Sequence, residues 1–514
     1  MTNYNTNRLP VLVGHPFAPI GRGEDIRCSF RAFRAVGHTL KIRDIYSVRT
    51  NPPDLHLEKE FSPHLVRQLG SSVNIFYING DEVEQALRHL DGDMPSGAYN
   101  IICPQWELSL YPKEWAEQLD RFDEVWAPSK FVFDSLRKAV SKPLFHMPLA
   151  TEVKLTSFLG RRYFGLPESS YLFLFYFDFR SYIERKNPFA VLEAFERVCA
   201  ARPKEDIRLV IKLNRPMGPS RWEADFPRFM KAIKQSKCID KIIIIDKVIT
   251  DNEVKNLVRC CDCFISLHRS EGYGRGMAEA MFLGKPVIAT GYSGNLDFMN
   301  EANSLLVPYK LIEVGEEQYP HWEGQVWADP DIDRAVEYMI KLLDDREYGR
   351  RLGQVASRYL RTHFGYRATG LRYLNRIEEI QCNRRLREIS DNWEKLARYD
   401  PLWSILTDPN RKGCWDEGEF FATGEAEVAS LMKYFQSKSI QVGREQALDF
   451  GCGVGRVTQA LAHHFERVVG VDASPTMIEL AMRYNKFRDR VVYILNKDPR
   501  SPSGMILSIS FSAS

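Results

Sequence analysis

Short runs of apolar residues alternate with helical segments along most of this 514-residue chain. The clearest run is YLFLFYFD at 171–178, which a helical segment follows at 189–200, and KIIIID at 241–246 contains four consecutive isoleucines. Strands with almost no polar positions are typical of parallel sheets that helices cover on both faces. The alternation therefore predicts an α/β fold built from doubly wound sheets.

The alternating segments fall into three groups, which begin near residues 9, 171 and 446. We expect two tandem Rossmann-like domains at 1–150 and 151–382, a helical linker at 383–445, and a truncated Rossmann-like fragment at 446–514. Helices are expected near 26–36 in the first domain and over 332–345 and 348–382 at the end of the second. Two doubly wound domains in tandem imply a ligand cleft between them.

Composition limits the classes of function. The formal net charge is only +3, which gives no electrostatic argument for binding nucleic acid. The ten cysteines lack metal-ligand spacing, which favours a reducing, cytoplasmic compartment. No apolar run approaches the roughly 18 residues of a membrane span.

A local group of basic residues lies between positions 22 and 43. A helix that carries four of them could lie against anionic lipid, which would place the protein peripherally at the inner face of a membrane. The other interpretation is a solvated helix face with some phosphate contacts. The residues are Arg22, Arg27, Arg31, Arg34, Lys41 and Arg43.

Two carboxylates flank a glycine-bearing turn in the stretch 263–298. An apolar strand at 263–267 leads into the turn, a helix at 277–283 follows it, and Glu271 and Glu279 are eight positions apart. A glycine turn that feeds a helix N-terminus offers unpaired backbone N–H groups to an anion. Carboxylate oxygens accept hydrogen bonds from sugar hydroxyls. The stretch therefore predicts a site for a sugar beside an anion.

Two cations follow the strand at 171–178, in the loop FRSYIERKNP. Arg180 can make a forked contact with phosphate oxygens, and Lys186 adds a point charge. Together they can neutralise a departing nucleoside diphosphate. Arg185 is an alternative for this role or else faces solvent, and ordinary exposed loop charges are the remaining interpretation.

With these features the second domain resembles the donor half of a retaining glycosyltransferase of the GT-B type, family 4. The landmarks are, in order, FRSYIERKNP, SLHRSEGYG, Glu271 with Glu279, and GKPVIATGYSGN. In the first domain, GRGE at 21–24 resembles the family's glycine loop near the acceptor side, and WEL with FDEVWAPSKF resembles its N-terminal domain. The resemblance covers about residues 9 to 382.

The resemblance implies transfer of a sugar from a UDP- or GDP-linked donor to a glycan or lipid-linked glycan. Configuration would be retained, and glycosyl transfer would require no metal or other cofactor. Arg180 and Lys186 would hold the diphosphate, Glu271 the donor sugar and Glu279 the ribose. Further donor contacts are expected at Gly272, Tyr273, Gly274, His268, Gly21 and Gly23.

The N-terminal domain departs from the family at one point. Many members carry a histidine near the donor sugar, whereas the matching segment ICPQWELS offers Glu107. Glu107 is therefore a candidate catalytic residue, and the alternative is a structural pair with Trp106 that caps a strand end. His15 and His268 lie near other strand ends, and a histidine at the position of His268 is equally consistent with a structural role.

The third group has its own glycine pattern, DFGCGVGR, after the strand at 447–450. Glycines let the backbone approach a ligand, and an acidic residue about 20 positions further on can accept both ribose hydroxyls. A nicotinamide cofactor could be bound by the same arrangement of glycines and a later acidic residue. The pattern and its lead-in GCWDEGEFFATG instead resemble class I S-adenosylmethionine-dependent methyltransferases. The expected cofactor residues are Asp449, Gly451, Gly453, Gly455 and Asp472.

This third group stops after its third strand, so strands four to seven of that family are missing. We therefore expect no methyl transfer. We also expect an exposed sheet edge, which the glycosyltransferase or an oligomer partner would cover. The alternative is that the sequence is cut or frameshifted. Two competing hypotheses address the whole chain. One is a methyltransferase with a glycan-binding front half, and the other is a non-catalytic scaffold that binds glycan or nucleotide.

Overall fold

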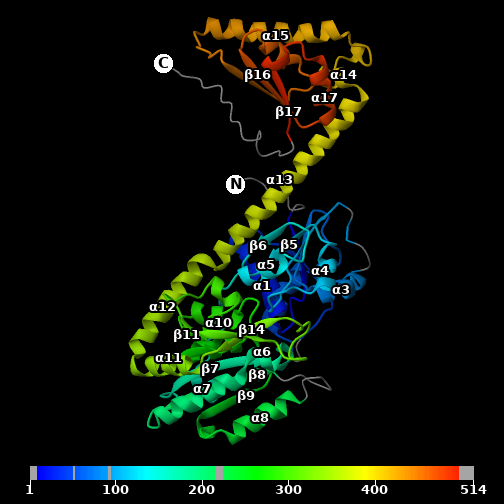
Figure 1. Ribbon diagram of the computed structural model, residues 1–514. Helices are drawn as coiled ribbons and strands as arrows, with labels where there is room; N and C mark the ends of the chain where they lie inside the picture. The colour runs from blue at the N-terminus through cyan, green and yellow to red at the C-terminus, as the bar shows by residue number, and fades with distance from the viewer. Residues whose placement is uncertain (1–8, 50–52, 91–93, 96, 215–223, 497–514) are drawn as a thin grey trace. The chain divides into compact units, whose positions relative to one another are not determined.

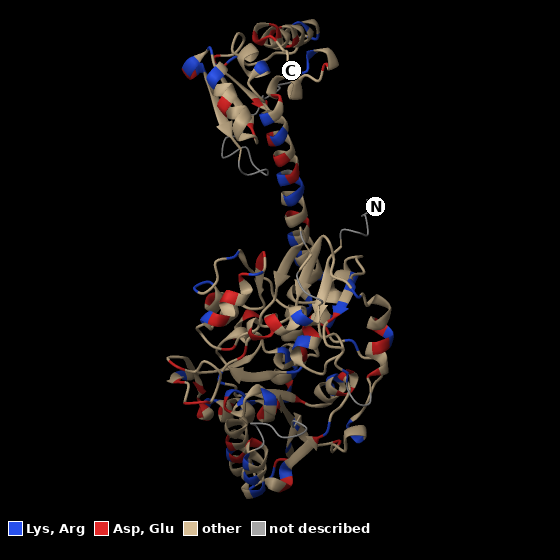
Figure 2. Ribbon diagram, turned by 90° about the vertical axis from the view of Figure 1, so that its right-hand side faces the viewer, with Lys and Arg blue, Asp and Glu red and all other residues tan. Residues whose placement is uncertain are grey.

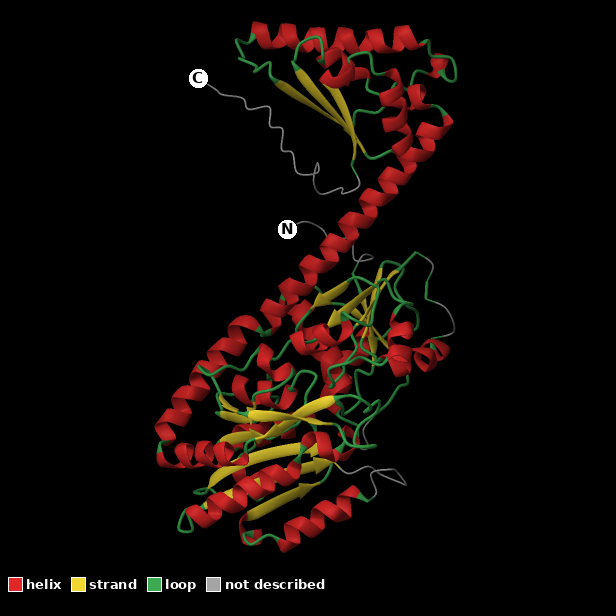
Figure 3. Ribbon diagram, in the orientation of Figure 1, coloured by secondary structure: helices red, strands yellow, loops and turns green. Residues whose placement is uncertain are grey.

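The computed structural model of the chain describes residues 9–49, 53–90, 94, 95, 97–214 and 224–496. It divides into two compact units, of which the first reaches Asn375 and the second begins at Arg376. The first unit contains two six-stranded sheets and an antiparallel pair of strands, and the second contains a three-stranded sheet (Figures 1 and 3). The predicted fold class, with two doubly wound sheets and a smaller third one, is confirmed.

The first sheet is parallel, in the order β2-β1-β3-β4-β5-β6. Its strands are β1 (Val11–Gly14), β2 (Lys41–Asp44), β3 (Val73–Phe76), β4 (Tyr99–Ile102), β5 (Glu124–Ala127) and β6 (Leu144–His146). The α-helices between them are α1 (Gly21–Ala35), α2 (Leu55–Phe61), α3 (Val83–His89), α4 (Lys113–Leu119) and α5 (Lys130–Leu136).

The second sheet is also parallel, in the order β12-β11-β10-β7-β8-β9. Its strands are β7 (Tyr171–Asp178), β8 (Ile207–Asn214), β9 (Ile242–Asp246), β10 (Cys263–Ser266), β11 (Val287–Thr290) and β12 (Leu305–Val307). The direction in which the chain adds strands reverses between β7 and β10. Ligands of open α/β sheets bind at such a reversal, outside the carboxyl ends of the strands.

Helices cover both faces of the second sheet. Phe173 and Phe175 of β7 pack in one core cluster with α7 and α11, whereas Leu172 and Leu174 pack in another with α10 and α12. This double coverage explains the nearly uninterrupted apolar run of β7. The helices are α6 (Ile183–Lys186), α7 (Pro188–Ala201), α8 (Asp225–Gln235), α9 (Asp251–Cys260), α10 (Arg275–Phe282), α11 (Ile332–Asp344) and α12 (Arg346–His363).

The expected single helix over 348–382 is wrong. α12 ends at His363, and α13 (Tyr366–Tyr399) begins three residues later. The Phe364 carbonyl accepts a hydrogen bond from the Thr151 backbone N–H at 2.7 Å, and Glu152 accepts from the Tyr366 N–H at 3.0 Å. These contacts with a distant segment satisfy backbone groups at the break.

The start of α1 also differs from expectation, because the helix begins at Gly21 rather than near residue 26. GRGE is therefore the first turn of a helix and not a glycine loop. Arg27 and Arg31 are only 4% and 6% exposed. Arg27 Nε lies 2.7 Å from Glu24 Oε2, and Arg31 Nη2 lies 2.7 Å from Glu60 Oε2. The predicted exposed basic face, whether for lipid or for solvent, is wrong because these guanidinium groups are paired inside the protein.

In the second unit, β15 (Gln446–Phe450), β16 (Arg467–Asp472) and β17 (Val491–Leu495) form a parallel sheet in sequence order. Charged residues of both signs follow one another along α13 (Figure 2). Glu394 of this helix accepts a hydrogen bond from Ser474 Oγ at 2.6 Å. Phe450, on the edge strand β15, is 66% exposed. The serine-rich tail lies outside the described residues. The remaining helices are α14 (Pro401–Ile405), α15 (Glu417–Ser437), α16 (Arg456–Leu461) and α17 (Pro475–Tyr484).

Candidate active site

A lysine and an arginine from α6 face one carboxylate from the segment after β10. Lys186 Nζ donates a hydrogen bond to Glu271 Oε1, and Arg185 Nη1 lies 3.3 Å from Glu271 Oε2. Arg185 is 4% exposed and also donates to the Ser270 carbonyl at 2.9 Å. Because β7 and β10 are neighbours, these contacts lie at the reversal point of the second sheet.

The backbone around α6 explains why both cations turn inward. Tyr182 and Asn187, which flank this one-turn helix, have positive φ values of 63° and 51°. Such values are uncommon for residues other than glycine and persist where surrounding contacts hold them. Asn187 Nδ2 donates to the Leu267 carbonyl at 3.0 Å, which ties the end of α6 to β10. The interpretation in which Arg185 faces solvent is wrong.

Burial and the neighbouring charges have opposite effects on the pKa values of Glu271 and Lys186. Burial by itself would raise the pKa of Glu271, but the cations of Lys186 and Arg185 lower that pKa to about 2. Burial lowers the pKa of Lys186, and the charge of Glu271 opposes this effect. Glu271 is therefore ionised at neutral pH and holds two cationic side chains beside the sheet.

Glu107 reaches the same cluster from the segment after β4. Its Oε1 lies 3.8 Å from Arg185 Nη2, and its Oε2 accepts a hydrogen bond from the Tyr319 hydroxyl at 2.6 Å. Its neighbour Trp106 is buried, and its ring packs against that of Trp115. Trp106 is thus a core residue, whereas Glu107 joins the first sheet to the charged cluster of the second.

Arg180 lies outside these contacts. Its Nη2 is 2.7 Å from Asp178 Oδ2, and its side chain is 47% exposed. Of the two expected diphosphate cations, the structure brings Lys186 to Glu271 and leaves Arg180 paired with Asp178. Arg185 takes the second place beside Glu271.

Glu279 lies on α10 within a second group of buried charges. It accepts a hydrogen bond from the Tyr176 hydroxyl at 3.4 Å. Burial raises the pKa of Glu279 to about 7 against the opposing charge of Lys255. Lys255 Nζ lies 2.9 Å from Glu24 Oε1 on α1, so ion pairing joins the helices of the two sheets at this point.

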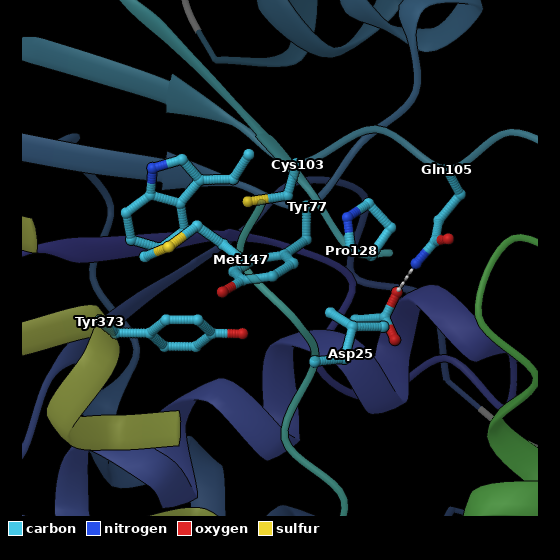
Figure 4. A pocket seen from close by; sticks show the side chains of 9 residues that line it. Asp25, Tyr77, Cys103, Gln105, Pro128, Met147 and Tyr373 are labelled. Atoms are coloured by element: carbon cyan, nitrogen blue, oxygen red, sulfur yellow. Dashed lines mark hydrogen bonds between the residues drawn. The ribbon is translucent and has the colours of Figure 1, made fainter. Parts of the chain in front are cut away.

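A second ion pair crosses at the same place and borders a small internal space. Arg275 Nη2 lies 2.5 Å from Asp25 Oδ1, and Gln105 Nε2 donates to Asp25 Oδ2 at 3.1 Å. Figure 4 shows the Asp25 and Gln105 side chains pointing toward one another, with Tyr373 nearby. The space that these side chains line has no room for a water molecule. The space is therefore part of the packed interior, and its lining comes from the first sheet's domain and from Tyr373 of α13.

The glycines of the β10–α10 turn are held closely. Gly274 has a φ of 92° at the start of α10, a conformation that favours glycine. A Cβ atom on Gly272 would lie 2.9 Å from Gln105 Oε1. Tyr273, between them, is buried, and its hydroxyl donates to the Leu149 carbonyl at 3.0 Å. The turn therefore abuts the first sheet's segments directly.

Gly21 and Gly23, the other predicted donor contacts, lie on the first turn of α1. A Cβ atom on Gly23 would lie 2.2 Å from the Ala18 carbonyl oxygen, whereas one on Gly21 would meet no atom within 4 Å. Gly23 thus permits a close backbone approach inside the first domain.

The two histidines are held by protein groups. His268 is fully buried, with Nδ1 3.0 Å from Ser266 Oγ and Nε2 3.2 Å from Asn295 Oδ1. Burial lowers the pKa of His268. These contacts fit the structural interpretation of His268. His15 Nε2 lies 2.5 Å from Glu82 Oε1 in the first sheet's own loops.

Tyr319 was not identified from the sequence. It lies between β13 (Tyr309–Glu313) and β14 (Val326–Pro330), an antiparallel pair that the strand predictions also missed. The alternation in KLIEV and the run QVWA carry a weak period-two signal that could have suggested this hairpin. No local pattern indicates that Tyr319 would contact Glu107, more than two hundred positions earlier.

In the second unit, the glycine turn after β15 has the expected form. Gly451, Gly453 and Gly455 all have positive φ, and Asp472 Oδ2 accepts from the Gly453 N–H at 2.8 Å. Asp449 accepts from the Thr458 hydroxyl at 2.6 Å. A Cβ atom on Gly451 would meet no atom within 4 Å. An open glycine backbone beside a carboxylate fits the adenosine part of S-adenosylmethionine.

Three further observations concern metals, thiols and membranes. Within the described ranges, no three His, Cys, Asp or Glu side chains are grouped so that they could hold a metal ion. The ten cysteines are free thiols. No helix in the part of the chain that the structure describes is long and apolar enough to cross a membrane.

Two families match parts of the chain. Residues 161–359 match glycosyl transferases group 1, and residues 447–501 match the methyltransferase domain. No curated protein matches the chain closely enough to be a relative.

Solved structures share the fold of the first unit. One is sucrose-phosphate synthase from Thermosynechococcus elongatus, with a TM-score of 0.53, 16% identity, and coverage of 73% of this chain and 100% of that one. Another is HepE from Anabaena in complex with UDP-glucose, with a TM-score of 0.51, 11% identity, and coverage of 72% and 99%. The two Rossmann-like domains therefore have the GT-B arrangement, as the resemblance implied. The chain contains a glycosyltransferase group 1 domain, followed by a methyltransferase-domain segment.

Proposed function

We propose that the first unit is a retaining, metal-independent glycosyltransferase of family 4. It moves a sugar from a UDP- or GDP-linked donor to a glycan or a lipid-linked glycan. The observation that carries this proposal is the position of Lys186 and Arg185 beside Glu271 at the reversal point between β7 and β10. The UDP-glucose complex of the Anabaena protein is in keeping with a nucleotide-sugar donor.

Charge neutralisation is the main chemical task of these residues. The bond between the anomeric carbon and the diphosphate oxygen breaks, and the nucleoside diphosphate leaves with additional negative charge. Lys186 and Arg185 stabilise that charge, and Arg180 joins them when its side chain turns away from Asp178. Glu271 accepts hydrogen bonds from the donor sugar, and Glu279 accepts them from the ribose.

Glu107 is the proposed catalytic residue on the acceptor side of the reaction. Retention in one step requires the acceptor oxygen to approach from the face on which the diphosphate leaves. The distance of 3.8 Å between Glu107 Oε1 and Arg185 Nη2 supports a carboxylate close to the departing diphosphate, where such an acceptor would enter. As the acceptor oxygen bonds to the anomeric carbon, its proton passes to Glu107 or to the departing diphosphate.

Donor entry requires the two domains to separate. Gly272 packs against Gln105 so closely that a Cβ atom would lie 2.9 Å from Gln105 Oε1, which leaves no space for a sugar at the turn. The ion pairs of Glu24 with Lys255 and of Asp25 with Arg275 would break and re-form in each cycle.

For the second unit we propose binding of S-adenosylmethionine. Asp472 would hold the ribose, and the open backbone at Gly451 would approach the rest of the cofactor, with Asp449 nearby. When bound, this cofactor supplies an activated methyl group. We also propose a cytoplasmic location, because eight of the ten free cysteines are buried thiols.

The test combines nucleotide binding with donor hydrolysis. UDP and GDP are screened by thermal shift, and labelled UDP-glucose and GDP-mannose are then incubated with the full chain without acceptor. Stabilisation by one nucleotide class, and release of that diphosphate, support the proposal. Absence of any shift and of any release contradicts it. NMR of the anomeric proton in the transfer product tests retention.

A further inference from the structure

An open cavity of about 570 Å³ lies against the loop between β13 and β14. It is lined by residues 316–323 of this loop, by Tyr182, Ile183 and Glu184 after β7, and by Asp225 at the start of α8. The donor residues of the proposed function come from the segments after β7 and β10, so the cavity adjoins that site without including Lys186 or Glu271.

The chemistry of the lining is distinctive. Carboxylates and aromatic rings predominate, and no lysine or arginine is among the described residues that line the cavity. The carboxylates of Glu316, Glu317 and Glu323 belong to exposed residues, so they are within reach of a solute. The aromatic members are Tyr182, Tyr319 and Trp322.

The cavity lies next to the acceptor-side carboxylate. Tyr319 belongs to its wall, and its hydroxyl donates a hydrogen bond to Glu107 Oε2 at 2.6 Å. The Tyr182 ring packs on the Tyr319 ring at 4.6 Å between centroids. A molecule that fills the cavity is thus separated from Glu107 by one side chain.

The loop is held in a defined conformation. Gln325 Oε1 accepts from the Leu110 N–H at 3.0 Å, and its Nε2 donates to the Leu110 carbonyl at 2.7 Å. Glu317 and His321 have positive φ values of 57° and 51°. Non-glycine residues persist in this region only where the surroundings over-determine it, and they are enriched at binding sites.

We propose that this cavity is the acceptor subsite and that it takes a neutral or amino-bearing sugar. This inference rests on the proposed glycosyl transfer. Carboxylate oxygens accept hydrogen bonds from hydroxyl and ammonium groups, and aromatic rings cover the apolar face of a sugar. The same carboxylates repel phosphate and uronate groups. The acceptor sugar that forms the new glycosidic bond therefore carries no phosphate group.

The test uses three aryl glycosides as acceptor probes: p-nitrophenyl glucoside, p-nitrophenyl glucosaminide with a free amine, and p-nitrophenyl glucuronide. The donor is the nucleotide sugar that the wild-type chain hydrolyses. We expect transfer to the first two and none to the third. In the double variant E316Q/E317Q we expect KM for the glucosaminide to rise at least tenfold, with unchanged donor hydrolysis and unchanged melting temperature.

The matched control is Glu313→Gln, an exposed carboxylate on β13 that does not line the cavity. It should leave every constant unchanged. Equal KM values in the double variant and the control overturn the inference. Preferred transfer to the glucuronide also overturns it. So does absence of transfer to both other probes while donor hydrolysis persists. Failure of the wild-type chain to hydrolyse any donor or bind any nucleotide identifies instead a failure of the proposed function, and with it of this inference.

Discussion

The Tyr319 hydroxyl lies 2.6 Å from Glu107 Oε2 and joins a hairpin of the second domain to a loop of the first. Arg185 Nη2 lies 3.8 Å from the second carboxylate oxygen, Glu107 Oε1, and the Arg185 guanidinium carbon is 5.8 Å from the centre of the Tyr319 ring. The carboxylate thus has a neutral donor and a cation as partners. Its position depends on three segments that are far apart in the chain.

Replacing Tyr319 with Phe keeps the ring and removes the hydrogen bond to Glu107. We expect a loss of about 1 kcal/mol in the free energy of unfolding, because one buried hydrogen bond is lost. We expect kcat for transfer to fall about tenfold, which corresponds to about 1.4 kcal/mol in the barrier. Steady-state kinetics and chemical denaturation measure both. Tyr309→Phe, at an exposed position on β13, is the control, and an unchanged kcat in Y319F would contradict the positioning role.

Replacing Lys186 with Ala removes a cation that, in the proposed function, stabilises the departing diphosphate. We expect transfer to slow by about 10²- to 10³-fold, as when other preorganised electrostatic groups are removed. Initial rates with saturating donor measure the effect. Lys204→Ala, at an exposed loop position, should have the wild-type rate. A K186A rate within a factor of two of wild type would exclude the role.

Replacing Arg185 and replacing Arg180 should have different effects on stability and on nucleotide binding. Removing the buried Arg185 leaves Glu271 and Glu107 without a shared partner, so R185A should destabilise the protein by about 3 kcal/mol or more. Arg180 is about half exposed and pairs with one carboxylate, so R180A should change stability by less than about 1 kcal/mol. R180A should nonetheless weaken UDP or GDP binding if the side chain reaches the diphosphate. Thermal unfolding and calorimetric titration separate the two effects, and equal destabilisation by both variants would count against this assignment.

The raised pKa of Glu279 predicts a specific pH dependence of stability. Its pKa is about 7 in the folded protein, above the usual 4.5, because burial favours the neutral acid. The folded state therefore binds more protons than the unfolded state between these pH values, and stability falls as pH rises through this window. Glu279→Gln should reduce the fall between pH 5 and pH 8 by more than about 1 kcal/mol.

Chemical denaturation of wild type and E279Q at the two pH values measures this difference. Glu271 supplies the opposite case, since its pKa is lowered to about 2. Its contribution is present above pH 4.5 and is lost as pH falls toward 2. If E279Q and wild type lose the same stability between pH 5 and pH 8, Glu279 does not titrate in that window.

Asp472 should control binding of S-adenosylmethionine by the second unit. Its carboxylate accepts from the N–H groups of Gly453 and Ser474, both at 2.8 Å, and so shapes the glycine turn. In the proposed site it would also hold the ribose. We expect D472A to weaken binding of labelled S-adenosylmethionine at least tenfold in equilibrium dialysis of the full chain. Asp489→Ala, in the loop before β17, should bind as wild type does. Equal binding by D472A and wild type would contradict the site.

The sequence was sufficient for the α/β class, and the resemblance implied that two distant loops serve one donor site. The apolar run of β7 could be read because a strand covered on both faces has almost no polar positions. Glu271 and Lys186 follow strands that such a fold can make neighbours. The resemblance assigned the diphosphate to one of these loops and the donor sugar to the other, without knowledge of any side-chain contact.

Only the tertiary structure decided which charges are buried together at the candidate site. Arg180 and Arg185 look equivalent in the loop, but positive φ at Tyr182 and Asn187 turns Arg185 inward. Arg27 and Arg31 form a basic pattern in the sequence, yet Glu24 and Glu60 pair with them inside the protein. Sequence periodicity reports the faces of one element, whereas the partner of a buried charge comes from a distant segment. The contact of Tyr319 with Glu107 is of this second kind, because it exists only once the hairpin β13–β14 packs against the first domain.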